Sequence, residues 1–324
     1  MCTAITYNSG NHYFGRNLDV EGSYDEEIII APKNFQFKFR KMPEIKEHYA
    51  IIGAGIILED YPLFFDATNE AGLSVAGLSF SGNAVYYPKD VKKDNITPFE
   101  FIPWILADCK SVLDAKKKLC KLNLLKLDFN KSLTLSPLHW MIADKKSSIT
   151  VEPLKEGLRI YDNPVGVLTN NPTFDIQMFN LNNYIHLSNK APENNFSEKL
   201  PLNLYSRGMG ALGLPGDLSS SSRFVKAVFT KLNSVSGKDE EESVNQFFHI
   251  LGSVYQQRGC VDIGKGVYEI TEYSSCCNID KGIYYYKTYE NSSVTGVDMH
   301  KENLFGKELI SYPMVKKGQF FVQN

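Results

Sequence analysis

The residue with the clearest chemical potential is Cys2, which directly follows the initiating methionine. A small second residue favours removal of Met1, and Cys2 would then carry both a thiol and a free α-amine. An unperturbed α-amine titrates at about pH 7.7–8.0 and a cysteine thiol at about 8.5, so the amine can take the thiol proton near neutral pH. Such a nucleophile needs no histidine. We therefore expect Met1 to be removed and Cys2 to act in amide hydrolysis.

Two charged residues are candidates to support this nucleophile. Asp19 could hold the ammonium form of the α-amine, and Arg16 could favour the thiolate through its positive charge. The alternative interpretations are an exposed ion pair at a strand end and a chain that begins Met-Cys by chance. From these residues alone, the two interpretations carry equal weight.

Other familiar catalytic motifs are missing from the sequence. The six histidines show neither H-x-x-x-H nor H-E-x-x-H spacing, so we expect no metal site. His139, beside Trp140, is expected to be a hydrogen-bonded core residue. The sequence contains no Gly-x-Ser-x-Gly elbow and no P-loop, and no G-x-G-x-x-G follows an expected strand. We therefore expect no serine nucleophile and no cofactor.

The chemistry at the N-terminus depends on a regular element that holds the chain end. Residues 2–7 are typical of a β-strand, residues 8–11 of a turn, and residues 12–17 of a second strand that pairs back. A strand that starts at the terminus fixes a chain end that normally frays. This hairpin would bring Arg16 and Asp19 close to the nucleophile.

Further hairpins and helices follow the first one. Two more hairpins are predicted, namely residues 61–65 with 73–78 across a turn at 69–72, and 269–273 with 283–286 across 280–282. Four helices are predicted, namely 97–107, 111–122, 222–232 and one that begins at Ser243 and stops at Gly259. The first of these opens with a capping box of Thr97 and Glu100 around Pro98. Strands and helices that occur in separate runs indicate a layered α+β domain and not alternating βαβ units.

Composition and charge exclude several classes of protein. The 324 residues are 43% hydrophobic and 22% charged, which is enough for a full core, and we expect a single domain over residues 2–324. Thirty-five basic and 37 acidic residues give a formal charge of −2 without a basic stripe, so a nucleic-acid partner is not expected.

The N-terminal segment and the cysteines indicate the cellular compartment in which we expect the protein. The first twenty residues contain no apolar signal segment, and the longest apolar stretch, 50–58, is too short to span a bilayer. The six cysteines, of which Cys276 and Cys277 are adjacent, do not form a disulfide framework. We therefore expect a cytoplasmic protein with reduced thiols and no membrane partner.

Several short blocks occur in a fixed order along nearly the whole chain. They are MCTAI (1–5), FGRNLD (14–19), NEAGL (69–73), LHW (138–140), GVLTNNP (166–172), LPGD (214–217) and SRF (222–224). Together they resemble the choloylglycine hydrolase family, which contains bile salt hydrolases and penicillin V acylases. The likeness is closest to bile salt hydrolases of Gram-positive gut bacteria.

This resemblance implies a four-layer αββα N-terminal-nucleophile fold, with two antiparallel sheets between helical layers, and a homotetramer. It implies that Cys2 is the nucleophile and that Arg16 and Asp19 steady its thiolate and amine. It also implies that Asn170 is a side-chain donor of the oxyanion hole and that Arg223 is a charged residue beneath the site. Without the resemblance, Asn170 is a turn residue and Arg223 an ordinary helix cation.

The resemblance also implies a substrate, a conjugated bile acid that releases glycine or taurine. Ser79 stands where bile salt hydrolases usually carry Asn and penicillin V acylases often carry Tyr. A backbone N–H donor to the oxyanion would survive at Ser79, whereas a side-chain contact to the substrate would be weakened. The segments that line the apolar pocket in the family contain Leu18, Leu58, Phe65, Phe129, Leu133 and Leu138, although core packing is an equally good interpretation of each.

Two other functions stay open at this stage. A penicillin V acylase would use the same mechanism on a phenoxyacetyl amide. If Met1 is retained, Cys2 has only an amide nitrogen, and the protein would be a catalytically inactive bile-acid-binding homologue.

Overall fold

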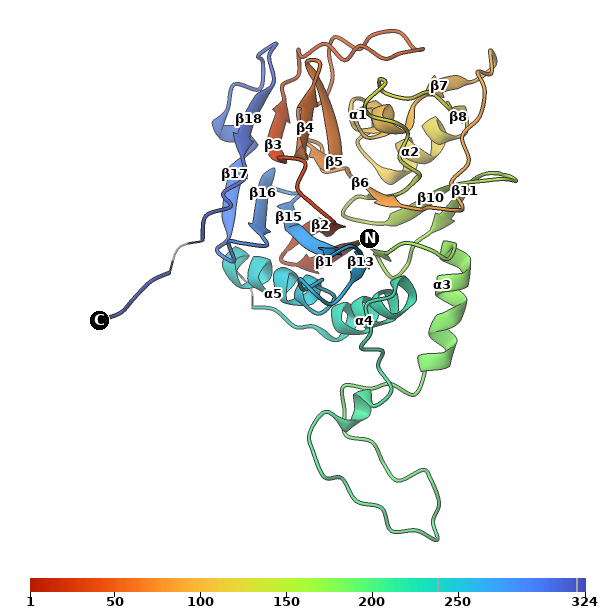
Figure 1. Ribbon diagram of the computed structural model, residues 1–324, viewed down its shortest axis with the longest axis vertical. Helices are drawn as coiled ribbons and strands as arrows, with labels where there is room; N and C mark the ends of the chain where they lie inside the picture. The colour runs from red at the N-terminus through yellow and green to blue at the C-terminus, as the bar shows by residue number, and fades with distance from the viewer. Residues whose placement is uncertain (238, 319) are drawn as a thin grey trace.

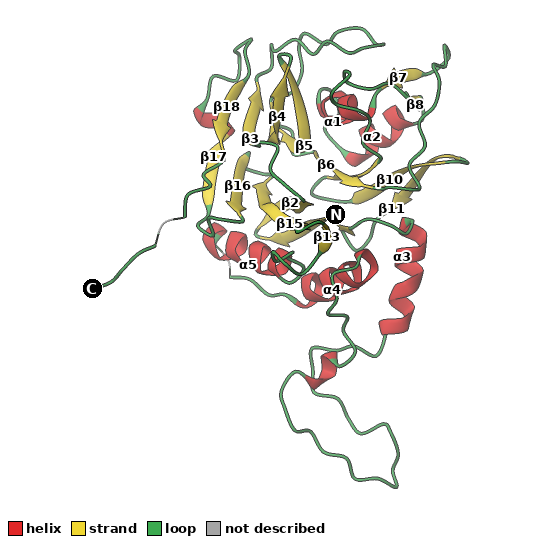
Figure 2. Ribbon diagram, viewed as in Figure 1, coloured by secondary structure: helices red, strands yellow, loops and turns green. Residues whose placement is uncertain are grey.

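Two antiparallel sheets stack against each other, and helices cover their outer faces (Figure 1). The structure is a computed structural model that describes residues 1–237, 239–318 and 320–324. Figure 2 shows the strands gathered in the middle of the molecule and the helices at its periphery. This is the four-layer α+β sandwich that the resemblance implies.

The first sheet has six strands and contains the N-terminus. Its strands are, in spatial order, β12 (Val167–Leu168), β1 (Cys2–Ser9), β2 (Asn11–Val20), β15 (Ile270–Asn278), β16 (Ile283–Thr288) and β17 (Thr295–Asp298). Helices α4 (Ser220–Asn233) and α5 (Glu240–Gly252) pack on its outer face, below the sheet in Figure 1. The start of β1 therefore lies in the interior.

The second sheet has eight strands. They are, in spatial order, β11 (Gly157–Asp162), β10 (Ser148–Leu154), β9 (Leu138–Ala143), β6 (Ser74–Ser79), β5 (Tyr61–Asn69), β4 (Ile51–Leu58), β3 (Glu27–Ala31) and β18 (Ile310–Pro313). Helices α1 (Phe101–Leu106) and α2 (Val112–Leu119) pack on its outer face. Both faces of this sheet are consequently covered.

Smaller elements connect the two sheets and their helices. They are helix α3 (Phe174–Asn180), the 3₁₀ turns η1 (Pro98–Glu100), η2 (Leu181–Tyr184), η3 (Met209–Ala211) and η4 (Met299–Lys301), and the short strands β7 (Asp94–Ile96), β8 (Leu122–Leu124), β13 (Asp262–Gly264) and β14 (Val267–Tyr268). None of the helices in the described ranges has the length and apolar character needed to cross a membrane.

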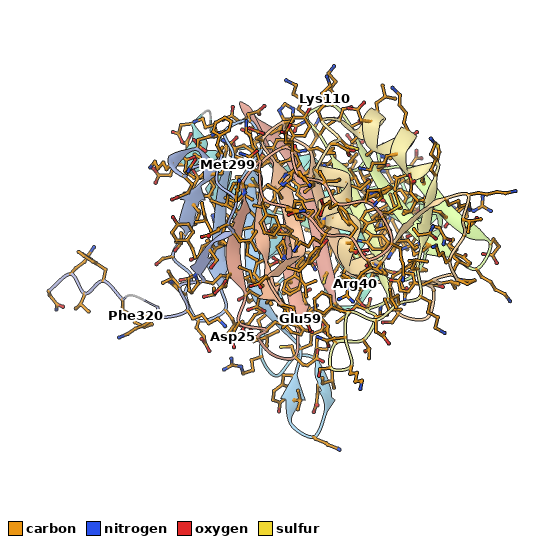
Figure 3. The ribbon with its side chains drawn as sticks, turned by 90° about the horizontal axis from the view of Figure 1, so that it is seen from above. Asp25, Arg40, Glu59, Lys110, Met299 and Phe320 are labelled. Carbon is orange, nitrogen blue, oxygen red and sulfur yellow. The ribbon has the colours of Figure 1, made fainter. Side chains whose placement is uncertain are left out.

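Strand periodicity divides the apolar residues between two cores. In β3, Ile28 and Ile30 belong to the core between the sheets, whereas Ile29 and Ala31 belong to the core under α1 and α2. Alternate residues of a strand point to opposite faces, so a sheet covered on both sides needs apolar residues at every position. Figure 3 shows side chains filling the space between the strands.

The long loop between η2 and α4 leaves the body of the molecule as an arm. The arm comprises residues 185–215 and extends downward in Figure 1. At its base, the N–H of Ser188 donates to the carbonyl oxygen of Gly210 at 2.8 Å. Apolar side chains along the arm are exposed, among them Ile185, Phe196 and Tyr205.

The predicted N-terminal hairpin is confirmed, and the two later hairpins need a correction of register. Residues 66–68 of β5 pair with β6, but residues 61–64 pair only with β4, which lies along β5 from Tyr61 to Asn69. Likewise residues 273–278 of β15 pair with β16, whereas β15 also lies along β2 from residue 270 onward. In both cases the strand is longer than the predicted segment and pairs with its preceding neighbour along its length, and only its later part also forms the hairpin.

The predicted helices exist with shifted ends. The capping box of Thr97 and Glu100 is present at the start of η1, which leads into α1. Helix α5 begins at Glu240 with Asp239 as N-cap, so the prediction that Ser243 starts it is wrong; Ser243 is buried inside the helix. Helix α2 ends at Leu119 and not at residue 122, because the chain there enters β8. Helix α3 was not predicted.

Candidate active site

Cys2 is the first residue of β1 and is almost completely buried, with 4% of its surface exposed. It lies opposite Leu18 in the antiparallel ladder with β2. Two positions along, Ala4 pairs with Leu168 of β12 on the other side. The chain start is thus held between two strands, and Figure 1 marks it at the centre of the molecule.

Arg223 of α4 is fully buried behind Cys2. Its Nη1 donates at 2.6 Å to both the carbonyl oxygen of Cys2 and Oγ1 of Thr3. Its Nη2 donates to Oδ1 of Asn170 at 2.7 Å, and its Nε donates to the carbonyl of Leu218 at 3.0 Å. Burial lowers the pKa of Arg223, and the nearby acidic groups oppose this effect. The guanidinium therefore ties helix α4 to the first residues of the chain.

Asp19 of β2 lies in the same buried cluster. Its Oδ1 accepts a hydrogen bond from Oγ1 of Thr271 at 2.7 Å, and its Oδ2 lies 3.8 Å from Nη1 of Arg223. Burial raises the pKa of Asp19, and the charge of Arg223 partly counteracts this. Within the described residues, Oδ2 has no hydrogen-bond partner. This oxygen is available to an ammonium group at the N-terminus.

Arg16 connects the two sheets. It is buried on β2, and its Nη1 donates to the carbonyl oxygen of Phe65 at 3.1 Å and to that of Gly77. Burial alone would lower the pKa of Arg16, but the acidic groups around it, Cys2 first among them, outweigh burial and raise it. The positive charge of Arg16 is therefore retained next to the thiol.

Asn170 follows β12 and approaches Cys2 from the side. Its Oδ1 accepts from the backbone N–H of Cys2 at 2.9 Å, and its Nδ2 donates to the carbonyl of Ser79 at 2.8 Å. Its own N–H donates to Oγ of Ser220 at 2.8 Å. The side-chain amide of Asn170 thus lies between the nucleophile and Ser79, where it can act as a hydrogen-bond donor to an acyl oxygen.

Ser79 ends strand β6 opposite Leu138 of β9. The next residue, Phe80, donates its N–H to the carbonyl of Pro137 at 2.8 Å. Because the N–H groups of successive strand residues point to opposite sides, the N–H of Ser79 points away from β9. The Oγ of Ser79 instead lies 3.2 Å from Oγ of Ser81. The backbone N–H of Ser79 is therefore a second candidate oxyanion donor.

Comparisons with known proteins agree with this geometry. Residues 2–312 match the family model described as linear amide C–N hydrolases, choloylglycine hydrolase family. The chain belongs to the choloylglycine hydrolase family. It is accordingly an enzyme that hydrolyses linear amides, and the N-terminal cysteine in the centre of its fold fits the N-terminal-nucleophile class.

Two curated relatives and one solved structure match the chain over 96–100% of its length. A protein of Lactiplantibacillus plantarum named bile salt hydrolase/transferase is 58% identical, with 100% of both chains covered. Another of that name from Clostridium perfringens is 40% identical, with 96% of both chains covered. The crystal structure of the C2A mutant of the conjugated bile acid hydrolase from Clostridium perfringens superposes with a TM-score of 0.92 at 38% identity, with 100% of both chains covered.

A penicillin V acylase from Agrobacterium tumefaciens shares the fold. Its TM-score is 0.74 at 20% identity, with 96% of this chain and 91% of that chain covered. At this identity the likeness concerns the architecture of the choloylglycine hydrolase family and not the substrate.

The apolar residues that the family resemblance implies fall into two groups. Leu18 and Phe65 belong to the core between the sheets that also contains Cys2, and the ring of Tyr24 lies 5.7 Å from that of Phe65. Leu138 packs in the other core, under α1 and α2, because strand alternation turns its neighbour His139 inward instead. The structure does not bring Leu138 to Cys2.

The remaining three apolar residues lie near the turn between β4 and β5. The ring of Phe129 is 6.5 Å from that of Tyr61, and the N–H of Phe129 donates to the carbonyl of Leu133 at 3.2 Å. Leu58 pairs with Tyr61 at the same turn. These residues form one neighbourhood, which is built around Tyr61 and not around Cys2.

His139 is a hydrogen-bonded core residue, as predicted. It is fully buried, with Nε2 2.9 Å from the carbonyl of Thr169 and Nδ1 3.2 Å from Oε1 of Glu152. The ring of Phe80 stacks on it at 4.2 Å. His139 supports the backbone just before Asn170. No group of three or more His, Cys, Asp or Glu residues that could hold a metal ion occurs in the described ranges.

Sequence reasoning missed Glu269. This residue precedes β15 and is 9% exposed, and its carboxylate forms an ion pair with the ammonium group of Met1. The same ammonium group donates to the carbonyl oxygen of Asp19 at 2.7 Å. No local motif marks Glu269, because it reaches the site through the pairing of β15 with β2, some 250 residues away in the sequence. Thr271, which donates to Asp19, was missed for the same reason.

Proposed function

We propose that this protein hydrolyses the amide bond of glycine- or taurine-conjugated bile acids through a thioester on Cys2. The observation that carries the proposal is the buried position of Cys2, whose backbone nitrogen contacts Oδ1 of Asn170 at 2.9 Å and whose carbonyl is held by Arg223. The proposed substrate is based on two relatives that are named bile salt hydrolase/transferase and that match 100% and 96% of the chain.

The first half of the proposed reaction forms the thioester. The sulfur of Cys2 bonds to the amide carbonyl carbon, and the oxyanion accepts hydrogen bonds from Nδ2 of Asn170 and the N–H of Ser79. The C–N bond then breaks as the α-ammonium group of the mature Cys2 gives its proton to the departing nitrogen. Asp19 holds the ammonium group through Oδ2, which accepts no hydrogen bond from any residue that the structure describes, and Arg16 and Arg223 supply positive charge beside the thiolate.

The second half releases the acid. A water oxygen bonds to the thioester carbonyl carbon and passes a proton to the α-amine, and the C–S bond breaks to restore the thiolate. The apolar surface that receives the sterol is assigned to Leu18, Phe65 and the half-exposed ring of Tyr24. Leu58, Phe129 and Leu133 lie around Tyr61 and are a separate group, to which we assign a contact with the substrate only at a distance from Cys2.

One experiment tests the chemistry. The intact mass of the purified protein is measured. The protein is then treated with a low dose of iodoacetamide and assayed with glycocholate and taurocholate. We expect a mass that lacks methionine, a single alkylation and loss of activity that parallels it. A Cys2→Ala variant that keeps full activity would end the proposal, as would an active protein that retains Met1.

A penicillin V acylase is the second candidate, because Ser79 departs from the residue that either branch of the family usually carries. Turnover of glycocholate, taurocholate and penicillin V by the same preparation separates the two candidates. A clear preference for penicillin V would overturn the bile salt assignment. A protein that retains Met1 and binds bile acids without turnover would instead be the inactive homologue.

We also propose that the protein is a homotetramer in the cytoplasm. Exposed apolar side chains on the arm, such as Phe196 and Tyr205 at 81% and 82% exposure, support a contact with other copies of the chain. The exposed thiols of Cys120 and Cys260 suit a reducing compartment. Light scattering should give four chains for the wild type and fewer for Phe196→Ser with Tyr205→Ser. The control is Val91→Ser, which removes an exposed apolar side chain that is not part of the arm.

A further inference from the structure

We infer that Glu269 and the carbonyl oxygen of Asp19 form a binding site for the primary ammonium group of the amine product. This inference rests on the proposed function and adds the recognition of the leaving group to it. In the structure, the ammonium group of Met1 occupies this site. It forms the ion pair with Glu269 and donates to the carbonyl oxygen of Asp19 at 2.7 Å.

The site lies close enough to Cys2 to receive the departing amine. The nitrogen of Met1 is three covalent bonds from the nitrogen of Cys2, so the two atoms are within about 4 Å of each other. A general acid must lie about 2.6–3.2 Å from the atom that it protonates. Once Met1 has been removed, the departing nitrogen takes one proton from the α-ammonium of Cys2 and leaves as a neutral primary amine. The site places this amine in the space that the Met1 nitrogen vacates, beside Glu269, where a second proton from solvent converts it to the ammonium group.

The surroundings hold the carboxylate in place. The backbone N–H of Glu269 donates to the carbonyl of Val261 at 2.9 Å, and the side chain is largely buried. Burial raises the pKa of Glu269, and the ammonium group that it faces lowers it again. The backbone of Asp19 is held as well, because Asp19 pairs with Thr271 in the ladder between β2 and β15, which does not involve Met1.

Removal of Met1 leaves these acceptors facing the emptied space. The carboxylate of Glu269 loses its ion pair, and the carbonyl oxygen of Asp19 loses a donor. A free primary ammonium group replaces both contacts, whereas a hydroxyl group would supply no charge. The side chain of Met1 is 29% exposed, so the space opens to solvent and gives the product an exit.

The experiment compares product inhibition by two molecules that differ only in the amine. Cholate release from glycocholate is measured with added taurine or with added isethionate, which carries a hydroxyl in place of the amine. The enzyme is the full chain without Met1, checked by intact mass. We expect taurine to inhibit the wild type, and its inhibition constant to rise about tenfold in Glu269→Gln, as for loss of one charge-assisted hydrogen bond.

Two matched variants control this result. Glu272→Gln removes a carboxylate of similar side-chain exposure, 13% against 12%, that faces Lys316 instead, and it should leave inhibition by taurine and cholate release unchanged. Glu269→Asp keeps the charge and should restore part of the taurine inhibition. Unchanged melting temperatures show that the variants are folded.

Each other outcome has a defined meaning. Absence of taurine inhibition in the wild type, an unchanged taurine inhibition constant in Glu269→Gln, or an equal change with isethionate would each overturn the inference. A shifted pH profile of kcat/KM with unchanged taurine inhibition would also overturn it, because Glu269 would then act on the α-amine of Cys2. A wild type that releases no cholate removes the proposed function, a result distinct from all of these.

Discussion

Arg223 donates a hydrogen bond to the carbonyl oxygen of Cys2 at 2.6 Å, across 221 residues of sequence. The same guanidinium reaches Thr3 and Asn170, so one buried side chain positions both the nucleophile and a candidate oxyanion donor. A cation in this place affects the reaction through geometry as well as charge.

Replacement of Arg223 by lysine separates these two contributions. Lysine keeps the charge but cannot reach all the acceptors that the planar guanidinium serves. We expect kcat to fall roughly 10- to 100-fold, since one or more hydrogen bonds to a charged group are lost. Steady-state kinetics measures the change. Arg258→Lys, at a side chain that is 56% exposed, is the control and should behave as the wild type.

Replacement of Asn170 by alanine should lower kcat about 10²- to 10³-fold, as for removal of one oxyanion donor. The neighbouring Asn171 offers a matched control, because its amide contacts Ser81 and Asn83 and not Cys2. The Asn171→Ala variant should keep kcat close to that of the wild type. Equal losses in the two variants would show that the loop as a whole matters, and not the amide of Asn170.

If the oxyanion donor at Ser79 is the backbone N–H, replacement of the Ser79 side chain should change kcat only slightly. Ser79→Ala keeps the N–H group, so kcat should stay within about threefold of the wild type, whereas loss of a true donor costs at least about 10²-fold. The Oγ of Ser79 contacts Ser81 in the structure, and Ser81→Ala is the parallel variant. A large loss in Ser79→Ala alone would assign the hydroxyl group, and not the backbone, to the reaction.

Lys231 of α4 gives a prediction for pH and stability. Burial lowers the pKa of Lys231 to about 8, and its Nζ donates to the carbonyl of Val165. Because the folded pKa is below the unfolded value, the folded state gains stability as pH rises from about 8 to above 10 and loses it again as pH falls. The gain is at most about 3 kcal/mol for a depression of two to three units.

The check is urea unfolding of wild type and Lys231→Met between pH 7.5 and 10.5. The difference in unfolding free energy between the two should move in favour of the wild type as pH rises. Subtraction removes the contribution of other titrating groups. A difference that does not depend on pH would contradict the depressed pKa of Lys231.

Local signals in the sequence predicted the part of the site that lies on one hairpin. The β-branched residues of β1, the turn after Ser9 and the strand that follows are close in sequence, and they place Arg16 and Asp19 beside Cys2. Asn170 and Arg223 carry no such signal. They were expected only because the blocks of sequence around them resemble a known family.

The remaining errors have a common physical cause. Glu269 reaches the site through a ladder between strands that are far apart in the chain, and the pattern of one strand does not reveal its partner. Leu138 and His139 are both compatible with the interior, and only the phase of β9 decides which of them faces Cys2. The start of α5 shifted because Asp239, and not Ser243, accepts the N–H of the first turn.

The hydrogen bonds between Met1 and Asp19 determine where an affinity tag can be placed on this enzyme. An affinity tag fused ahead of Met1 would have to pass the Glu269 carboxylate and would leave Cys2 without its own amine. The opposite end of the chain points away from the body of the molecule, where Phe320 is 95% exposed (Figure 3). Affinity tags should therefore be placed at the C-terminus. We expect a protein with an N-terminal tag to fold but to be inactive.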